Sequence, residues 1–319
     1  MSSAVINTPN TVIISGSNSR KLANSLGSIH DLPVLQHKVV HFINSEIKVA
    51  LPFKLELDTK VWIVQSTSNP ANDNLMEIFL LVDTLFIEGI RDINLVIPYY
   101  GYSRQDKQHL SGECMSIAMI TRIFKKLGVK KVLTTDIHNA DILATLPLKV
   151  QDNSCLPIMA QEIYKKLGLN IETEKDYIIG SPDQGGIFRC DLFAANFYKD
   201  QANSKTISVR KERELSKVHF SKAVELYGEI DRKKLILIDD VSTSGGTIIN
   251  AVELCKANNV EEIYVVIVHA DFAKGVLERF ENNEIIKTLF TTNTIEKPVE
   301  DLDWFTKVKV IDIAGSVEI

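Results

Sequence analysis

Short apolar runs rich in β-branched residues recur along the chain, and each is followed by apolar residues at helical spacing. The runs are apolar throughout rather than alternating, which is typical of strands covered on both faces by helices. They occupy residues 12–14, 61–65, 93–97, 132–135, 177–179, 235–238 and 263–268. Strand followed by helix, repeated in this way, predicts an α/β fold with doubly wound, mainly parallel sheets.

The chain is long enough for two such sheets, because 319 residues exceed the about 150 that one domain usually holds. Residues 130–136 resemble residues 233–239, since each segment is a basic pair, four strand residues and an acid. The apolar pattern lapses at 151–154. We expect one domain over residues 1–150 and a second over 151–319, with the last segment packing back on the first domain.

Charge and hydropathy exclude several classes of partner. Lys and Arg total 36 against 41 Asp and Glu, a net charge of −5, so no overall positive field attracts a nucleic acid. Apolar stretches fall far short of the about 20 residues that a membrane helix needs. The four cysteines stand singly without CxxC spacing, which argues against a zinc site or a disulfide framework. We expect a cytoplasmic protein that binds neither nucleic acid nor membrane.

The strongest local motif is residues 235–247, where an apolar strand ends in Asp239 and Asp240. A loop of small residues follows, and a helix is expected to begin near Thr247. Glycines let backbone amides approach an anion, and a helix N-terminus adds partial positive charge. The two carboxylates can accept hydrogen bonds from sugar hydroxyls or face a cation. The motif therefore predicts a site for a phosphorylated sugar, formed by Asp239, Asp240, Thr243, Ser244, Gly245, Gly246 and Thr247.

This motif resembles the ribose 5-phosphate loop of the type I phosphoribosyltransferase fold. Further segments are similar to the ribose-phosphate pyrophosphokinase family, in the order of that family: 65–70, 76–77, 96–107, 135–138 and 181–186. The resemblance extends from about Val12 nearly to the C-terminus. It implies two similar domains of the type I phosphoribosyltransferase-like fold. It also implies transfer of the β,γ-pyrophosphoryl group of ATP to the 1-hydroxyl of ribose 5-phosphate, giving phosphoribosyl pyrophosphate and AMP.

The resemblance also implies roles for particular residues. Mg²⁺ would be the cofactor, with His138 and Asp183 as its ligands, and both follow strands at their carboxyl ends. Lys211 and Arg213 would be the catalytic cations, although a shift of one residue would place Arg210 there instead. ATP would be bound by Phe42, Asn44, Glu46, Arg104, Gln105 and His138.

Family members assemble as homo-oligomers, with dimers that associate into a hexamer. We therefore expect a homo-oligomer, in which the hairpin around Phe42–Glu46 completes the ATP site of a neighbouring subunit.

Two departures from the family pattern leave alternatives open. Asn44 and Thr243 stand where the family usually has acids, so the base preference or the acceptor can differ. The same chemistry on another ribose-5-phosphoryl acceptor remains open, as does a non-catalytic regulatory relative. A nucleobase phosphoribosyltransferase would share the phosphate loop but would explain neither the two halves nor residues 99–105. Residues 106–113 are less basic than is usual in the family, which leaves regulation by phosphate or ADP open.

Overall fold

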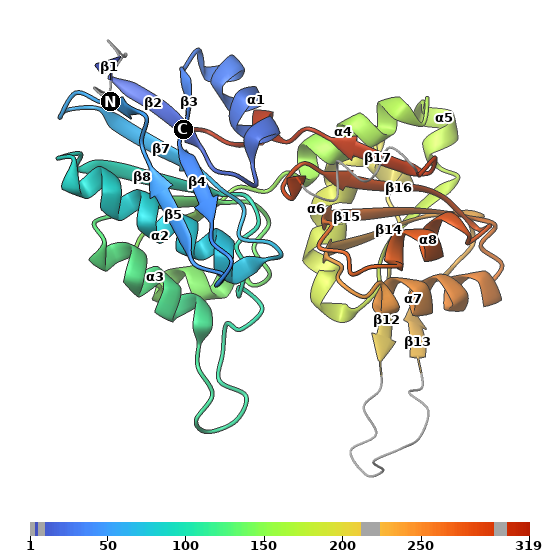
Figure 1. Cartoon of the computed structure of the whole chain (residues 1–319). Helices are drawn as coiled ribbons and strands as arrows, with labels where there is room; N and C mark the ends of the chain where they lie inside the picture. The colour runs from blue at the N-terminus through green and yellow to red at the C-terminus, as the bar shows by residue number, and fades with distance from the viewer. Residues whose placement is uncertain (1–3, 6–9, 212–223, 297–304) are drawn as a thin grey trace. The chain divides into compact units, whose positions relative to one another are not determined.

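The computed structural model describes residues 4–5, 10–211, 224–296 and 305–319 (Figure 1). Contacts divide the chain into two compact units. Unit 1 comprises Met1–Ser154, Asn293–Lys297 and Asp312–Ile319, and unit 2 comprises Cys155–Thr292 and Pro298–Ile311. The C-terminal residues therefore belong to unit 1. None of the helices in the described ranges has the length and hydropathy needed to span a membrane.

The main sheet of unit 1 has six strands in the order β10-β9-β8-β7-β2-β3, all parallel. The strands are β2 (Thr11–Ser15), β3 (Val34–Gln36), β7 (Lys60–Val64), β8 (Asp92–Ile97), β9 (Lys131–Thr134) and β10 (Val150–Asp152). The helices are α1 (Arg20–His30), α2 (Ala71–Ile87) and α3 (Ser116–Lys126), with a 3-10 helix η1 (Ala140–Thr145). Residues of α2 and α3 form one buried cluster with alternate strand residues such as Ile63 and Leu95. The intervening Ile13, Val64 and Val96 are also buried, so both faces of the sheet are covered.

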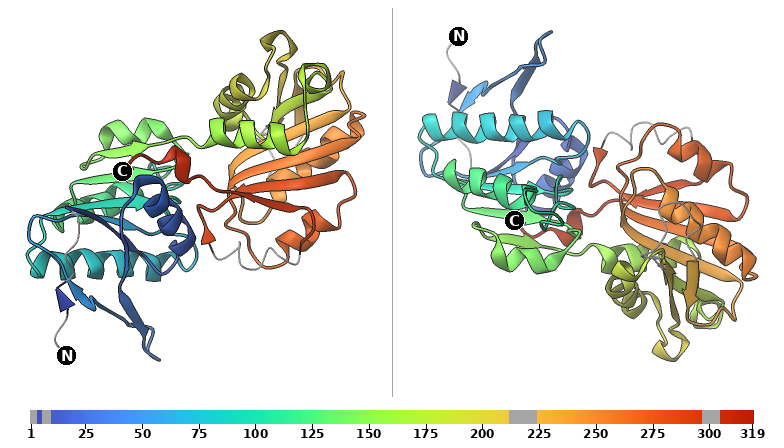
Figure 2. Two further views of the ribbon diagram at one scale, coloured as in Figure 1. Left: turned by 90° about the horizontal axis from the view of Figure 1, so that it is seen from above. Right: turned by 90° about the horizontal axis from the view of Figure 1, so that it is seen from below.

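A separate hairpin lies between β3 and β6 (Phe53–Lys54) in the chain. Its strands β4 (Lys38–His41) and β5 (Ile47–Ala50) are antiparallel and extend away from the main sheet (Figures 1 and 2). Ser45 at the tip has a φ of +69°, a left-handed conformation that only a tight turn normally imposes. A short parallel pair, β1 (Ala4–Val5) and β6 (Phe53–Lys54), completes unit 1.

The sheet of unit 2 has seven strands in the order β13-β12-β11-β14-β15-β16-β17, and only β13 is antiparallel to its neighbour. The strands are β11 (Tyr177–Ser181), β12 (Thr206–Lys211), β13 (Val224–Tyr227), β14 (Lys234–Val241), β15 (Glu262–His269), β16 (Ile286–Thr292) and β17 (Val308–Ile311). The helices are α4 (Leu156–Lys166), α5 (Ile171–Glu174), α6 (Ile187–Phe197), α7 (Gly246–Ala257) and α8 (Val276–Glu281). Unit 2 also contains the 3-10 helices η2 (Gln184–Gly186) and η3 (Gln201–Asn203). The 3-10 helix η5 (Ala314–Ser316) belongs to unit 1. The predicted α/β fold with mainly parallel sheets is confirmed.

Each main sheet contains a point where the order of its strands reverses. In unit 1, β2 lies between β3 and β7, and in unit 2, β11 lies between β12 and β14. The loops that follow two strands flanking such a point leave toward opposite faces of the sheet, which opens a crevice at the carboxyl ends. The crevice in unit 2 is bordered by the ends of β11 and β14, where the sequence places Asp183, Asp239 and the small-residue loop.

Candidate functional site

Three carboxylates gather at the strand ends of unit 2. Asp183 follows β11, and Asp239 lies in β14, which pairs with β11 (Ile179 beside Ile236). Burial raises the pKa of Asp239 well above its ordinary value, and the negative charges of Asp240 and Asp183 raise it further. The fold therefore concentrates negative charge at this edge, at a cost that a bound cation would relieve. Within the described ranges, however, no three His, Cys, Asp or Glu side chains come close enough to form a metal cage by themselves.

The two neighbouring aspartates differ in their surroundings. A carboxylate oxygen of Asp240 lies 3.1 Å from the Arg189 guanidinium of α6, and both side chains are largely buried. Asp239 Oδ1 accepts a hydrogen bond from the Asp240 backbone amide at 3.0 Å. Asp240 is thus charge-compensated within the protein, whereas Asp239 faces further carboxylates. The sequence pattern did not distinguish these two roles, because the Arg189 partner lies 51 positions away.

The loop after β14 has the geometry expected for an anion site. Helix α7 begins at Gly246, one residue before the predicted start. Gly245 has a φ of +70°, and a Cβ there would lie 2.9 Å from Val276 Cγ1, so no other residue fits without strain. Thr243 and Ser244 are exposed. The loop therefore presents small side chains and the amino end of a helix of 12 residues to solvent.

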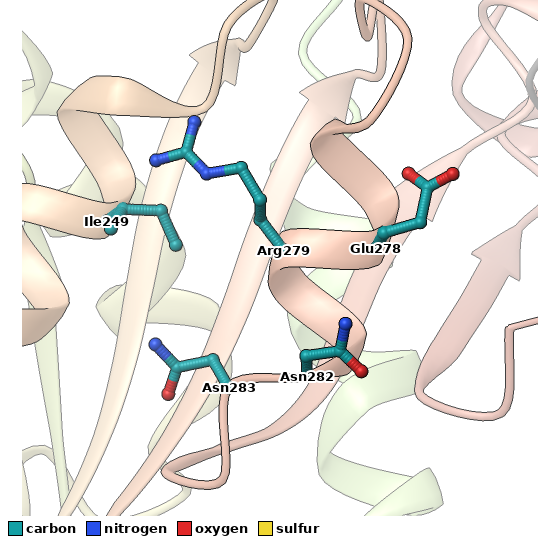
Figure 3. A pocket seen from close by; sticks show the side chains of 5 residues that line it. All are labelled: Ile249, Glu278, Arg279, Asn282 and Asn283. Atoms are coloured by element: carbon teal, nitrogen blue, oxygen red, sulfur yellow. The ribbon is translucent and has the colours of Figure 1, made fainter.

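Contacts from α8 and the segment before it hold this loop in place. Arg279 Nη1 donates to the Ser244 carbonyl at 3.2 Å, and the Ala273 amide donates to the Thr243 carbonyl at 2.8 Å. Arg279 also borders an open hollow of about 380 Å³ between α7 and α8 (Figure 3). The residues that line the hollow are Ile249, Glu278, Arg279, Asn282 and Asn283. None of the predicted site residues lines it, so the hollow is distinct from the strand-end site.

The turn that carries Asp183 is compact. The Ser181 hydroxyl donates to the Asp183 carbonyl at 2.5 Å, and a Cβ at Gly186 would lie 2.1 Å from Ser181 Oγ. Glycine at 186 therefore lets the chain fold tightly over the end of β11. This turn holds Asp183 on the side of the sheet edge where Asp239 lies.

In unit 1, the loops that follow β8 and β9 carry three of the residues predicted to bind ATP. Arg104 and Gln105 follow β8, His138 follows β9, and all three are exposed. The two strands are neighbours in the sheet. Asn139 Nδ2 also donates to Asp106 Oδ2 at 2.6 Å, which ties the two loops together. The fold therefore brings these three residues to one edge of the sheet of unit 1.

Glycine at 101 lets the loop after β8 pass close to the loop after β7. A Cβ at Gly101 would lie 2.2 Å from the Thr67 carbonyl, and the Gly101 amide donates to Thr67 Oγ1 at 2.6 Å. Ser116, the first residue of α3, donates to Gln105 Oε1 at 2.5 Å. Gln105 is thus held in place, while Arg104 extends into solvent.

The hairpin residues lie at the surface. Phe42 is 48% exposed, so it does not belong to the core of unit 1. Asn44 Oδ1 accepts from the Glu46 amide at 3.2 Å, a turn contact that an aspartate would also make. The Asn44 departure therefore preserves the shape of the hairpin and changes only its charge.

The proposed catalytic cations are described only in part. Lys211 is the last residue of β12, where it pairs with Val224 of β13. Arg213 lies outside the described residues. Their assignment, and the alternative with Arg210, stay predictions.

A network at the crevice of unit 1 was not predicted. The loop after β2 (16–19) and the loop after β7 (65–68) join through buried polar groups. The Asn18 amide donates to Gln65 Oε1 at 2.9 Å, Asn18 Nδ2 donates to Ser68 Oγ at 2.8 Å, and Gln65 Nε2 donates to Asn74 Oδ1 at 3.2 Å. The polar run at 65–70 was the signal in the sequence, but its partners at 16–19 are far away along the chain.

Comparisons with known proteins agree with the two-unit α/β fold. A family profile for the N-terminal domain of ribose phosphate pyrophosphokinase matches residues 11–128, and one for the phosphoribosyl transferase domain matches residues 156–304. A crystal structure of phosphoribosylpyrophosphate synthetase from Mycobacterium smegmatis has the same fold, with a TM-score of 0.82, 22% identity, and 96% of each chain covered. The fold and the matched domain profiles thus define an α/β protein of the phosphoribosyltransferase type, built from two such units.

Sequence relatives specify the family. The ribose-phosphate pyrophosphokinase of Clostridium perfringens is 31% identical over 95% of this chain and 92% of its own. Ribose-phosphate pyrophosphokinase 1 of Streptococcus agalactiae is 31% identical over 94% of this chain and 90% of its own. The chain belongs to the ribose-phosphate pyrophosphokinase family.

Proposed function

We propose that this protein transfers the β,γ-pyrophosphoryl group of ATP to the 1-hydroxyl of ribose 5-phosphate. In this reaction a bond forms between the 1-oxygen and the β-phosphorus, the bond from that phosphorus to the α-phosphate oxygen breaks, and the hydroxyl proton is released. The products are phosphoribosyl pyrophosphate and AMP. The observation that carries the proposal is the carboxylate pair beside an open phosphate loop at the crevice of unit 2, in a chain of this family.

In the proposed complex, the loop of unit 2 holds ribose 5-phosphate. Backbone amides at 243–247 and the amino end of α7 suit the 5-phosphate, and the small side chains leave room for it. The carboxylates of Asp239 and Asp240 suit the sugar hydroxyls as acceptors. The loop would thus hold ribose 5-phosphate by its 5-phosphate and by its sugar hydroxyls.

The donor set around Asp183 suits Mg²⁺. Hard cations prefer oxygen ligands. Burial, and after it the negative charges of Asp240 and Asp183, raise the pKa of Asp239, and a bound cation would offset those charges. An imidazole is a less typical ligand for this ion than a carboxylate, so Asp183 is the stronger of the two proposed ligands, and His138 the weaker. When bound, Mg²⁺ would neutralise charge on the phosphoryl oxygens.

We place the ATP site on unit 1. The Arg104 guanidinium matches phosphate oxygens as a planar fork, and Gln105 is oriented by Ser116. Phe42 is exposed and aromatic, so it can stack on a base, and Glu46 can accept from an exocyclic amine. As the family resemblance implies, this hairpin would act on a neighbouring subunit of a homo-oligomer. Lys211 and Arg213 would stabilise the transferring group.

The location follows from the same proposal. Each of the four cysteines is a thiol rather than half of a disulfide, and three of them are buried. Cysteines in the thiol form fit a reducing compartment, which supports a cytoplasmic enzyme.

The decisive experiment incubates the purified protein with ATP, Mg²⁺ and ribose 5-phosphate and measures AMP and phosphoribosyl pyrophosphate. We expect both products in equal amounts, and strongly reduced amounts of both in Asp183→Asn. AMP formed only with another 5-phosphorylated ribose would assign a different acceptor. No product with any acceptor would favour the non-catalytic relative.

A further inference from the structure

One buried carboxylate in unit 1 connects three segments that are far apart in the sequence. Glu77 of α2 accepts from the Ser17 amide at 2.8 Å and from the Ser17 hydroxyl at 2.5 Å. Its Oε1 also lies 3.1 Å from His37 Nε2, and the two side chains are only 2% and 3% exposed. Ser17 lies in the loop after β2, and His37 is the single residue between β3 and β4. The carboxylate therefore joins β2, α2 and the start of the hairpin.

The His37 ring is held by contacts from both of its nitrogens. Its Nδ1 lies 3.1 Å from the Ser15 carbonyl, an oxygen that can only accept. Its Nε2 faces the Glu77 carboxylate in an ion-pair contact that is not aligned as a hydrogen bond. Both ring nitrogens thus face oxygen atoms of other segments, which fixes the orientation of the ring. Burial raises the pKa of Glu77, but the contacts from His37 and Ser17 outweigh burial and hold this pKa below its ordinary value.

The hairpin strands β4 and β5 form a two-stranded sheet of their own, apart from the main sheet of unit 1. Strand β5 contacts α2, the helix that carries Glu77, and Val49 of β5 packs against the core cluster of unit 1. A two-stranded hairpin is marginally stable alone, so its direction depends on where its ends are fixed. His37 fixes the first end directly before β4, five residues from Phe42.

We infer that His37 is a positioning residue for the nucleotide, because its buried pair with Glu77 fixes the base of the hairpin that carries Phe42 and Glu46. The inference rests on the proposed function of the hairpin. A shift of about 1 Å in one side chain of a binding site is enough to weaken binding strongly. A change in direction at the base of the hairpin would move the side chains at its tip, so the base controls the contacts that the tip makes. Neither His37 nor Glu77 would itself touch the nucleotide.

The test compares His37→Asn with His30→Asn. His30 is a matched control, because its Nε2 also contacts a backbone carbonyl of unit 1, that of Val317, at 3.0 Å, but it lies in α1 rather than at the hairpin. We expect His37→Asn to raise KM for ATP about tenfold, with less than about a twofold change in KM for ribose 5-phosphate or in kcat. His30→Asn should leave KM for ATP unchanged.

A second measurement does not depend on activity. Amide hydrogen exchange in His37→Asn should become faster across β4 and β5 and stay unchanged in β7 and β8. Glu77→Gln should have the same two effects, and the double variant should be no worse than either single variant, because the two residues act as one pair. If His37→Asn does not fold, Glu77→Gln carries the same test.

Several results would overturn the inference. An unchanged KM for ATP with a lowered melting temperature would show that the pair only stabilises unit 1. Equal increases in both KM values, or exchange that is faster throughout unit 1, would have the same meaning. An inactive wild type would instead overturn the proposed function, while the exchange measurement would still decide whether His37 fixes the hairpin.

Discussion

At the scale of single residues, the two aspartates at the end of β14 illustrate how one sequence pair acquires two environments. Asp240 is paired with Arg189, and Asp239 is surrounded by carboxylates. The ionised form of Asp239 is therefore less favourable in the folded protein than in the unfolded chain. The contribution of Asp239 to the free energy of unfolding is greatest below pH 3.8, the ordinary pKa of its carboxyl group. This contribution is lost as the pH rises through the raised pKa of the folded protein.

This difference predicts opposite effects of two matched substitutions. Asp239→Asn should raise the melting temperature of the free protein at pH 7 by about 2–4 °C, since it removes an unfavourable charge. Asp240→Asn should lower the melting temperature, because Arg189 loses its buried carboxylate partner. Thermal unfolding without ligands measures both. A lower melting temperature for Asp239→Asn would contradict the electrostatic account.

Both variants should raise KM for ribose 5-phosphate more than KM for ATP.

Gly245 supports a second prediction at this scale. Gly245→Ala should lower the free energy of unfolding by about 1–3 kcal/mol, because it forces a side chain into a left-handed conformation against Val276. Gly168→Ala is the control variant. Gly168 has a φ of +64°, but a Cβ at this position would have no atom within 4 Å. Urea unfolding of both variants separates the cost of conformation from the cost of contact. Equal losses would mean that the contact with Val276 is unimportant.

At the scale of elements, the exposed hairpin predicts separable effects on binding and folding. Phe42→Ala should raise KM for ATP while leaving the melting temperature within about 1 °C, since a half-exposed side chain contributes little to the core. Ile43→Ala is the matched control, because Ile43 is a neighbouring hairpin residue that is fully exposed. If Ile43→Ala raised KM for ATP as much as Phe42→Ala does, stacking of Phe42 on the base would be ruled out.

The end of β12 supports another prediction for an element. Lys211→Ala and Arg213→Ala should lower kcat with little change in either KM, because cations that meet only the transferring group act in the transition state. Arg210→Ala should have a mild effect. Steady-state kinetics of the three variants provide the measurement. A larger loss in Arg210→Ala would shift the assignment by one residue.

At the scale of the whole molecule, the proposed sharing of the hairpin between subunits predicts complementation. Phe42→Ala and Asp183→Ala should each be weakly active alone. When co-expressed, they should regain activity, because some interfaces combine an intact hairpin with an intact Asp183. Activity of the mixture that only equals the average of the two variants, or sedimentation of a fully active monomer, would refute the shared site.

The sequence by itself determined the α/β class of this protein and the tight turn between β14 and α7. Continuous apolar strands such as 235–238 can be buried only between two layers of helices, and glycine at 245 follows from a local backbone conformation. Periodicity and turn chemistry are local properties, so they can be read from neighbouring residues. The family resemblance then supplied the candidate residues on these elements.

Only the tertiary structure decided which distant groups meet. The Arg189 partner of Asp240, the Glu77 partner of His37 and the exposure of Phe42 each depend on packing between elements separated by tens of residues. We expected the last segment to pack back on the first domain, and the structure decided which residues do so, namely 312–319. Charge pairing and burial are determined by distances in space, which a pattern along the chain does not contain.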